Sequence, residues 1–134
     1  MIQSFWIEGR LDGLNEYTRK CRSHKMAGAE AKKQNQMVVE EAIEKAGLRP
    51  VGEVGSFVGV TFYEAPKRKG SRRRDFDNIM FAVKFILDAL VAKGVLVDDD
   101  LDHVLHVSTS VRKASYDEGS SVFVTISTER NVVK

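Results

Sequence analysis

The chain has 134 residues and a formal net charge of +2, with 43% hydrophobic and 30% charged residues. This composition fits a soluble globular protein and excludes a bilayer-spanning chain, since no apolar run approaches the ~20 residues needed. The N-terminus lacks the basic-then-apolar order of a signal peptide, and the single cysteine, Cys21, excludes an internal disulfide. We therefore expect a cytoplasmic protein in which residues 1–134 form one domain.

The N-terminal third predicts a strand and a long helix. Residues 2–8 alternate loosely between apolar and polar types and predict the strand, in which we expect Trp6 in the core rather than on a base-stacking surface. Helix formers from about 16–46 predict the helix, which Gly47 and Pro50 end. Its basic first part, YTRKCRSHKMAG, is either a loop or an exposed helix on a working face.

Four further elements follow in the chain. Residues 51–65 are rich in β-branched and aromatic residues and predict a second strand, and residues 77–93 predict a second helix. Residues 104–113 and 120–128 alternate as strands, and we expect them to form a hairpin. The order β-α-β-α-β-β predicts an α+β fold with a small mixed sheet covered by two helices.

The segment 77–93 is apolar on most of its circumference. An ordinary surface helix has one apolar stripe, so we expect this helix to be buried by its own sheet and by a second copy of the chain, with a role in the core alone as the alternative. At ~100° per residue, Asp77, Lys84 and Asp88 share one narrow polar line. The alternative for this line is a solubilising Lys84–Asp88 pair.

Positive charge is concentrated just before this helix. Six of the eight residues from 67 to 74 are Lys or Arg: Lys67, Arg68, Lys69, Arg72, Arg73 and Arg74. Such a run is typical of a surface that holds backbone phosphates, and its alternative is a solvated charged loop.

Two acidic stretches flank the helix. Asp75 and Asp77 point the same way if the segment enters the helix extended with Asp77 as N-cap, and DDDLD occupies 98–102. If the chain doubles back so that these carboxylates converge, their repulsion requires a cation. Oxygen-only ligands favour Mg²⁺ or Mn²⁺. The alternative is a capping sequence followed by a charged turn.

The stretch RRRDFDN…KFILDALVAKGVLVDD resembles the signature of RusA-type Holliday junction resolvases. These are small homodimeric Mg²⁺-dependent endonucleases, many encoded by phages and prophages. The segment GRLDGLNEYTR also resembles the family's first loop, although the usual prolines are absent. The resemblance covers most of the chain in order and is densest over 72–99. It implies a RusA-like fold and paired phosphodiester hydrolysis at four-way junctions in DNA recombination and repair.

By position, the resemblance implies that Asp75, Asp77 and Asp99 hold the metal and that Lys84 is the catalytic lysine. The spacing from Asp77 to Lys84 is about one helical turn longer than in the family. Asp98 or Asp100 is an alternative to Asp99. The DNA contacts implied are those of the basic run together with Asn15, Arg19 and Lys20.

Two other functions are consistent with the sequence. One is a metal nuclease that acts on flaps, forks or RNA, and the other is a non-catalytic DNA-binding or recombination accessory protein. His103 and His106 lie three apart in a probable strand and so face opposite sides, which makes them a poor metal pair. GEVGSFVG lacks the following GK[ST] of a phosphate-binding loop. No small-molecule cofactor is expected. We expect the dimer interface at 77–93 and at exposed aromatic residues.

Overall fold

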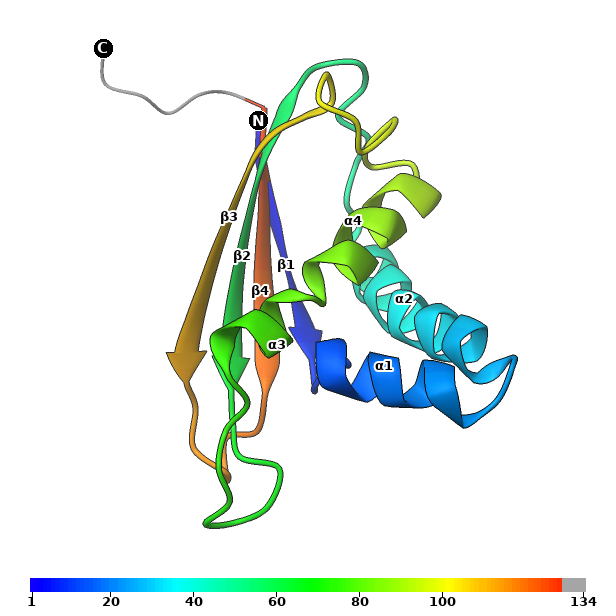
Figure 1. Cartoon of the computed structure of the whole chain (residues 1–134). Coiled ribbons are helices and arrows are strands. Elements are labelled where there is room, and N and C mark those ends of the chain that lie inside the picture. Colours follow the sequence, from blue (N-terminus) through cyan, green and yellow to red (C-terminus); the bar gives the residue numbers. More distant parts are fainter. Residues whose placement is uncertain (129–134) are drawn as a thin grey trace.

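The structure, a computed structural model, describes residues 1–128 (Figure 1). Its elements in chain order are β1 (Ile2–Glu8), α1 (Leu14–Ser23), α2 (Ala27–Ala46), β2 (Ser56–Glu64), α3 (Phe76–Met80), α4 (Val83–Ala92), β3 (Val104–Lys113) and β4 (Ser121–Ser127).

The four strands form one sheet in the order β1-β4-β2-β3. β2 and β3 run parallel and are joined by the α3–α4 crossover, whereas β4 pairs antiparallel with both β1 and β2. The α+β class and the mixed sheet are therefore confirmed. β2 is shorter than the predicted strand over 51–65, because Val51 to Gly55 lie outside the sheet and the Val51 N–H bonds to the Val95 carbonyl instead (2.9 Å).

The predicted hairpin is wrong. β3 lies at the sheet edge beside β2, and the segment after it crosses the end of β2 so that β4 inserts between β1 and β2. Burial explains the placement, since Val122, Val124 and Ile126 of β4 are at most 2% exposed, whereas β3 is largely polar and exposed. Alternation identifies a strand but does not choose its neighbour.

The helix predicted over 16–46 is two helices. The chain turns at His24, whose backbone is extended (φ −164°, ψ 166°), before α2 begins. α1 has no buried residue, so a straight continuation would extend it away from the core. The turn brings the two helices together where Gly28 leaves room for Cys21, since a β-carbon at Gly28 would lie 2.6 Å from Cys21 Sγ. The basic stretch is therefore an exposed helix.

The helix predicted over 77–93 is also interrupted, at Phe81 and Ala82. The Ala82 N–H bonds to the Ile79 carbonyl at 3.2 Å, an i→i+3 contact that tightens the turn. The break turns Phe81 toward α1, where its ring centroid lies 5.3 Å from that of Tyr17. The predicted pair of helices thus becomes α1, α2, α3 and α4.

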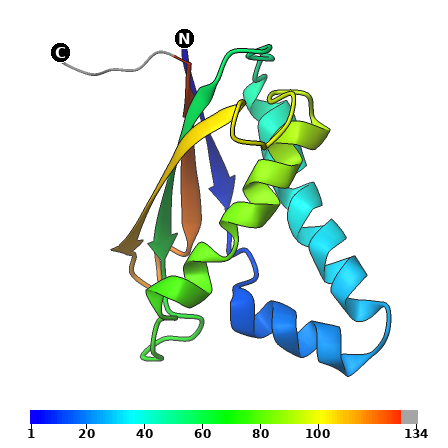
Figure 2. The same cartoon turned by 45° about the horizontal axis from the view of Figure 1, so that its top comes forward.

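All the helices of residues 1–128 cover one face of the sheet, and none of them covers the opposite face, called the bare face below (Figures 1 and 2). The apolar side of α4 fills the core between them, with Phe85, Ile86, Ala89 and Leu90 at most 1% exposed. Most of the apolar circumference of the 77–93 segment is thus buried by the chain itself, which favours the core role over the expected interface.

Trp6 is not in the core as predicted. It is 53% exposed on the bare face of the sheet, where its ring packs against Phe123 (centroids 4.7 Å apart) and Tyr63 (5.6 Å). Among the residues that the structure describes, no helix is long and apolar enough to cross a membrane.

Candidate metal and nucleic-acid site

Asp75 and Asp77 lie in one pocket with the end of the basic run. The pocket has a volume of about 390 Å³ and lies where α1 and α3 begin. It is lined by Leu14, Asn15, Arg72, Arg73, Arg74, Asp75, Asp77 and Asn78. The N-cap of α3 is Asp75 rather than the predicted Asp77, and its side chain makes no capping hydrogen bond. Both carboxylates are exposed and are not used to cap the helix.

Arg74 lines this pocket, and its guanidinium is bound on several sides by the protein. Its guanidinium donates to both oxygens of Glu64 (2.6 and 2.8 Å), to Glu16 Oε1 (2.8 Å) and to the Leu11 carbonyl (2.9 Å). The Arg74 side chain is 10% exposed and that of Glu64 only 3%. Arg10 adds a second cation 3.6 Å from Glu64. The network joins the end of β2 to the start of α1.

Titration behaviour follows from this network. Burial alone would lower the pKa of Arg74, but hydrogen bonds and charge from Glu64 and Glu16 raise it above the ordinary arginine value. Burial raises the pKa of Glu16, but the Gly13 N–H and Arg74 together bring it below the usual glutamate value. Both groups are therefore held in their charged forms.

The network also explains why α1 and α3 approach closely. A β-carbon at Gly13 would lie 2.6 Å from Asn78 Oδ1 and 3.0 Å from Arg74 Nη1, so only glycine fits there. The Asn15 N–H donates to Asn78 Oδ1 (2.8 Å). The segment with Asn15 is thereby held against the segment with Asp77.

The six predicted phosphate contacts fall into two groups. Arg73 donates to the carbonyls of Glu64 (2.9 Å) and Ala114 (2.7 Å), and Arg74 is held as described, so these two guanidiniums have structural partners. The other four lie on an exposed loop and have no side-chain ion pair with the described residues: Lys67, Arg68, Lys69 and Arg72.

The remaining predicted DNA contacts, Asn15, Arg19 and Lys20, all lie on α1. Arg19 is exposed, and Lys20 pairs with Asp12 (2.6 Å). Asn15 lines the pocket itself. These residues extend the basic surface of the pocket along α1.

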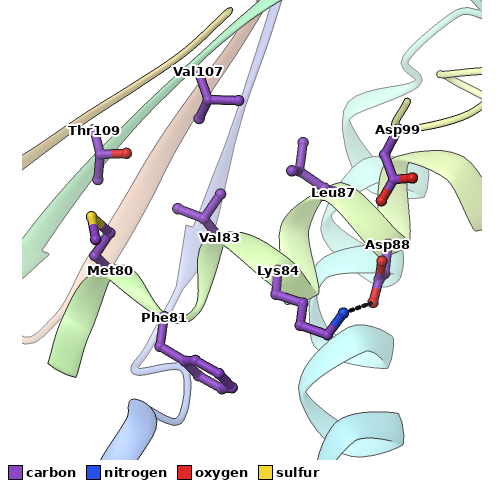
Figure 3. Close-up of a pocket in the computed structure, with 9 residues that line it drawn as sticks. All are labelled: Met80, Phe81, Val83, Lys84, Leu87, Asp88, Asp99, Val107 and Thr109. Atoms are coloured by element: carbon purple, nitrogen blue, oxygen red, sulfur yellow. Dashed lines mark ion pairs between the residues drawn. The ribbon is translucent and has the colours of Figure 1, made fainter. Parts of the chain in front are cut away.

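Lys84 and Asp99 lie elsewhere, in a groove beside α4 (Figure 3). Lys84 Nζ is 3.8 Å from Asp88 Oδ2, and Lys32 Nζ is 3.7 Å from the same oxygen. Asp99 lines this groove next to Asp88. The Lys84–Asp88 ion pair expected as the alternative is therefore present, and Lys84 lies on α4 rather than on the helix of Asp77.

The predicted three-carboxylate cluster does not form within one chain. Asp75 and Asp77 line one pocket, and Asp99 lines another. Within residues 1–128 no group of three or more His, Cys, Asp or Glu side chains is placed to hold a metal ion. The chain does double back after α4, but it returns beside Asp88 rather than as far as α3.

Asp98 and Asp100 are used in the turn itself. Asp98 Oδ1 accepts from the Asp99 N–H (2.7 Å), and Asp100 Oδ1 accepts from the N–H groups of Asp102 (3.2 Å) and His103 (3.0 Å). Neither Asp98 nor Asp100 lines the pocket of Asp75 and Asp77, so neither provides the third carboxylate that was expected from Asp99. The carboxylates of Asp98 and Asp100 thus accept hydrogen bonds within a turn, as the charged-turn alternative for residues 98–102 expects.

His103 lies in this turn before β3 rather than in a strand, so the expected opposition of His103 and His106 across a strand is wrong. Its ring contacts Glu53 (2.8 Å) and Asp100 (2.6 Å). These hydrogen bonds, with Glu53 contributing most, raise the pKa of His103 from 6.5 to about 9. The same contact lowers the pKa of Asp100.

We expect His103 to stabilise the fold in a pH-dependent way. Its folded pKa is raised, so its contribution is fully present below the ordinary pKa of 6.5 and is lost as the pH rises through about 9. The free energy of unfolding of the wild type, measured in urea, should exceed that of His103→Gln by more at about pH 6 than at about pH 10. An advantage equal at both pH values would contradict the ion-paired histidine.

Three residues that hold the segments around the pocket together were not predicted from the sequence: Glu16, Glu64 and Asn78. Glu64 had a usable signal, because it ends an apolar strand at a position whose alternation points inward. A charged residue at such a position requires a buried partner, and the neighbouring arginines were the candidates.

The chain matches no protein-family model, and the comparison with curated proteins gave no match. The resemblance to the RusA-type resolvases therefore remains a prediction from the motif.

Proposed function

We propose that this chain is a Mg²⁺-dependent, structure-selective endodeoxyribonuclease that cuts four-way DNA junctions as a RusA-like homodimer. The observation that supports it most is the shared pocket of Asp75, Asp77 and Arg72. It brings two exposed carboxylates to the end of a basic loop that can follow a phosphate backbone. A solvated charge run alone does not account for a buried arginine network directly beside two exposed carboxylates.

The donor set of the pocket fits magnesium. Mg²⁺ is commonly bound by one or two carboxylates, with water and substrate phosphate completing its octahedron. Asp75 and Asp77 supply the two carboxylates, and no softer ligand lines the pocket. A magnesium ion bound there supplies an activated water and stabilises charge on the phosphate. Asp99 takes part only if it comes from a second chain.

The other residues have positioning roles in this proposal. Lys67, Arg68, Lys69 and Arg72 bind phosphates along the loop, and Asn15 contacts the strand beside the pocket. The buried Arg74–Glu64 pair fixes the backbone position that directly precedes Asp75.

The division of the basic residues predicts a particular salt dependence. Four phosphate contacts should reduce DNA affinity roughly 10²-fold between about 50 and 200 mM salt, whereas six would reduce it on the order of 10³-fold. Fluorescence anisotropy of a labelled junction in EDTA measures this slope without cleavage. A slope matching six contacts would mean that two further cations bind phosphate, either Arg19 and Lys20 on α1 or Arg73 and Arg74 released from their protein partners.

The experiment that tests the function compares a synthetic four-way junction with linear duplex of the same sequence. We expect the purified full chain to cut the junction at paired sites in Mg²⁺, with no cutting in EDTA and little cutting of the duplex. Faster cutting of flaps or forks, or of RNA, would assign the same site to another substrate. Binding without cutting in Mg²⁺ or Mn²⁺ would contradict the proposal.

Two observations favour a second candidate, a non-catalytic DNA-binding or recombination accessory protein. Asp99 does not join Asp75 and Asp77 in the single chain, and Lys84 is paired with Asp88. In this alternative the basic loop and pocket bind DNA, and the aspartates only begin a helix. Junction binding that is equal in Mg²⁺ and EDTA, with no cleavage, distinguishes it.

A further inference from the structure

The bare face of the sheet has an unusual composition for a surface exposed to water. The alternation of the strands directs Ile2, Ser4, Trp6 and Glu8 outward on β1, and Ile2 and Trp6 are 66% and 53% exposed. On the neighbouring strands the outward positions are mostly Ser, Thr and Gly with a few aromatic residues. No helix of the described residues covers this face (Figures 1 and 2).

Charge is nearly absent from this face, although 30% of the chain is charged. Among the Asp, Glu, Lys and Arg side chains of the described strands, Glu8 and Arg112 are the two that point outward on this face. The register places them in one row across the sheet, in the order Glu8, Ser121, Tyr63, Arg112, so that they lie at opposite edges. Few charges and exposed aromatic residues are typical of the centre of a protein–protein interface, whereas a nucleic-acid surface is rich in Lys and Arg.

We propose that this face binds the same face of a second copy, with the two-fold axis parallel to the strands and midway between β4 and β2. This symmetry places β1 over the partner's β3 and β4 over the partner's β2. The inference deepens the homodimer part of the proposed function and rests on it.

The symmetry brings opposite charges together. Glu8 lies across from the partner's Arg112, and Arg112 lies across from the partner's Glu8, so the contact forms twice. Packed sheets are rotated by about 30°, which displaces these corner positions, about 12 Å from the centre of the face, by roughly 6 Å. The long side chains of Glu and Arg bridge that displacement.

The same symmetry places large side chains opposite small ones. In the row Trp6, Phe123, Thr61, Ser110, the axis sets Trp6 over the partner's Ser110 and Phe123 over the partner's Thr61. Tyr63 likewise meets the partner's Ser121. Aromatic side chains thus enter spaces left by hydroxyl residues, which is the complementarity that close packing requires.

The other face-to-face two-fold axis, perpendicular to the strands, is disfavoured by the same register. It lays each strand antiparallel on its own copy and reverses the rows. Ile2 would then meet the partner's Glu8, and His106 would meet the partner's Arg112. An apolar side chain against a carboxylate and a histidine against a guanidinium offer no attraction.

The size of the face predicts a reversible dimer. Four strands of about seven residues cover a flat area of roughly 450 Å². The accessible surface of the side chains on it is larger than this flat area and approaches the ~800 Å² per partner of a standard interface. An interface at the lower end of this range dissociates on dilution.

Charge exchange tests the proposal. We expect wild type to sediment as a dimer that dissociates on dilution, and Glu8→Arg to weaken the dimer roughly 10²-fold by placing like charges together. The double variant Glu8→Arg with Arg112→Glu should restore wild-type association. The matched control Glu41→Arg makes the same charge change on α2, on the helix side of the sheet, and should leave association unchanged. Circular dichroism confirms that each variant folds.

Trp6 provides a local readout, because it is the single tryptophan of the chain. Its emission should shift to the red on dilution and match that of Glu8→Arg. A monomeric wild type, or a double variant that stays as weak as Glu8→Arg, would overturn the proposal. So would quenching of Trp6 by single-stranded DNA without a change in mass, which would assign the face to nucleic acid.

The outcome is separable from that of the proposed function. Asp77→Asn should dimerise as wild type does even if all cleavage is lost. A wild-type dimer without nuclease activity would support the proposed interface and contradict the proposed nuclease function. A monomer that cuts junctions would support the nuclease function and contradict the proposed interface.

Discussion

Asp77→Asn should abolish junction cutting while leaving junction binding and the fold intact. The substitution keeps the size of the side chain but removes a carboxylate ligand, and such a loss should cost more than the ~100-fold typical of weakened outer contacts to a metal. Asp77 is exposed and makes no capping hydrogen bond at the start of α3, so little stability should be lost. Single-turnover cutting of the labelled junction in Mg²⁺ measures the effect.

Asp99→Asn and Asp88→Asn are the control variants for this prediction, because they remove carboxylates of the neighbouring groove instead of the pocket. If the metal is held by Asp75 and Asp77 of one chain, both comparison variants should cut at close to the wild-type rate. If Asp99 alone matches Asp77 in its effect, a second chain completes the site through a contact other than the face-to-face dimer proposed above. Full activity of Asp77→Asn would contradict the assignment of the pocket.

Glu64→Ala should be the most destabilising single substitution in the region of the pocket. It leaves the buried guanidinium of Arg74 without its bidentate partner and removes the nearest carboxylate from Arg10. Breaking a buried pair in this way costs about 3–5 kcal/mol, a large part of the 5–15 kcal/mol by which a domain of this kind is stable. Urea unfolding followed by circular dichroism measures the loss.

Lys84→Ala is the matched control for this prediction. It breaks the Lys84–Asp88 pair, in which Lys84 is 58% exposed, so its cost should be below about 1 kcal/mol. If the two substitutions cost the same, Arg74 would not depend on Glu64. The pocket would then need another explanation for its shape.

The sequence predicted the strands well because each follows a period of two. All four predicted strands are present, and the inward positions of β4, such as Val124, are those that the alternation indicates. What alternation lacks is the identity of the neighbour. The segment between β3 and β4 reads as a hairpin turn, yet it crosses the end of β2 because the more apolar β4 gains more from the centre of the sheet.

The long helices were predicted in type but not in continuity. Nothing in the local sequence at His24 or at Phe81 requires a break, since neither Pro nor Gly is present at these two positions. Tertiary packing makes both breaks: one sets Gly28 against Cys21, and the other sets Phe81 against Tyr17. Propensity alone is a weak guide where packing decides.

The candidate site was half predicted. Asp75 and Asp77 do share a pocket with Arg72, because adjacency in sequence almost ensures adjacency in space. Asp99 is joined to them only through the path of the chain after α4, which no local pattern determines. Counting charges also could not show that Arg74 serves a buried carboxylate rather than a phosphate.

The measurement that tests the central claim most directly is paramagnetic mapping with Mn²⁺, which replaces Mg²⁺ at oxygen sites. Mn²⁺ added in small amounts to the ¹⁵N-labelled protein broadens the amide signals nearest to the bound ion. If Asp75 and Asp77 bind the metal, the signals of Asn15 and of residues 75–78 should disappear first, and Asp77→Asn should abolish this. If broadening begins instead at residues 98–102 and is unaffected by Asp77→Asn, the pocket does not bind the metal and the proposed nuclease site is wrong.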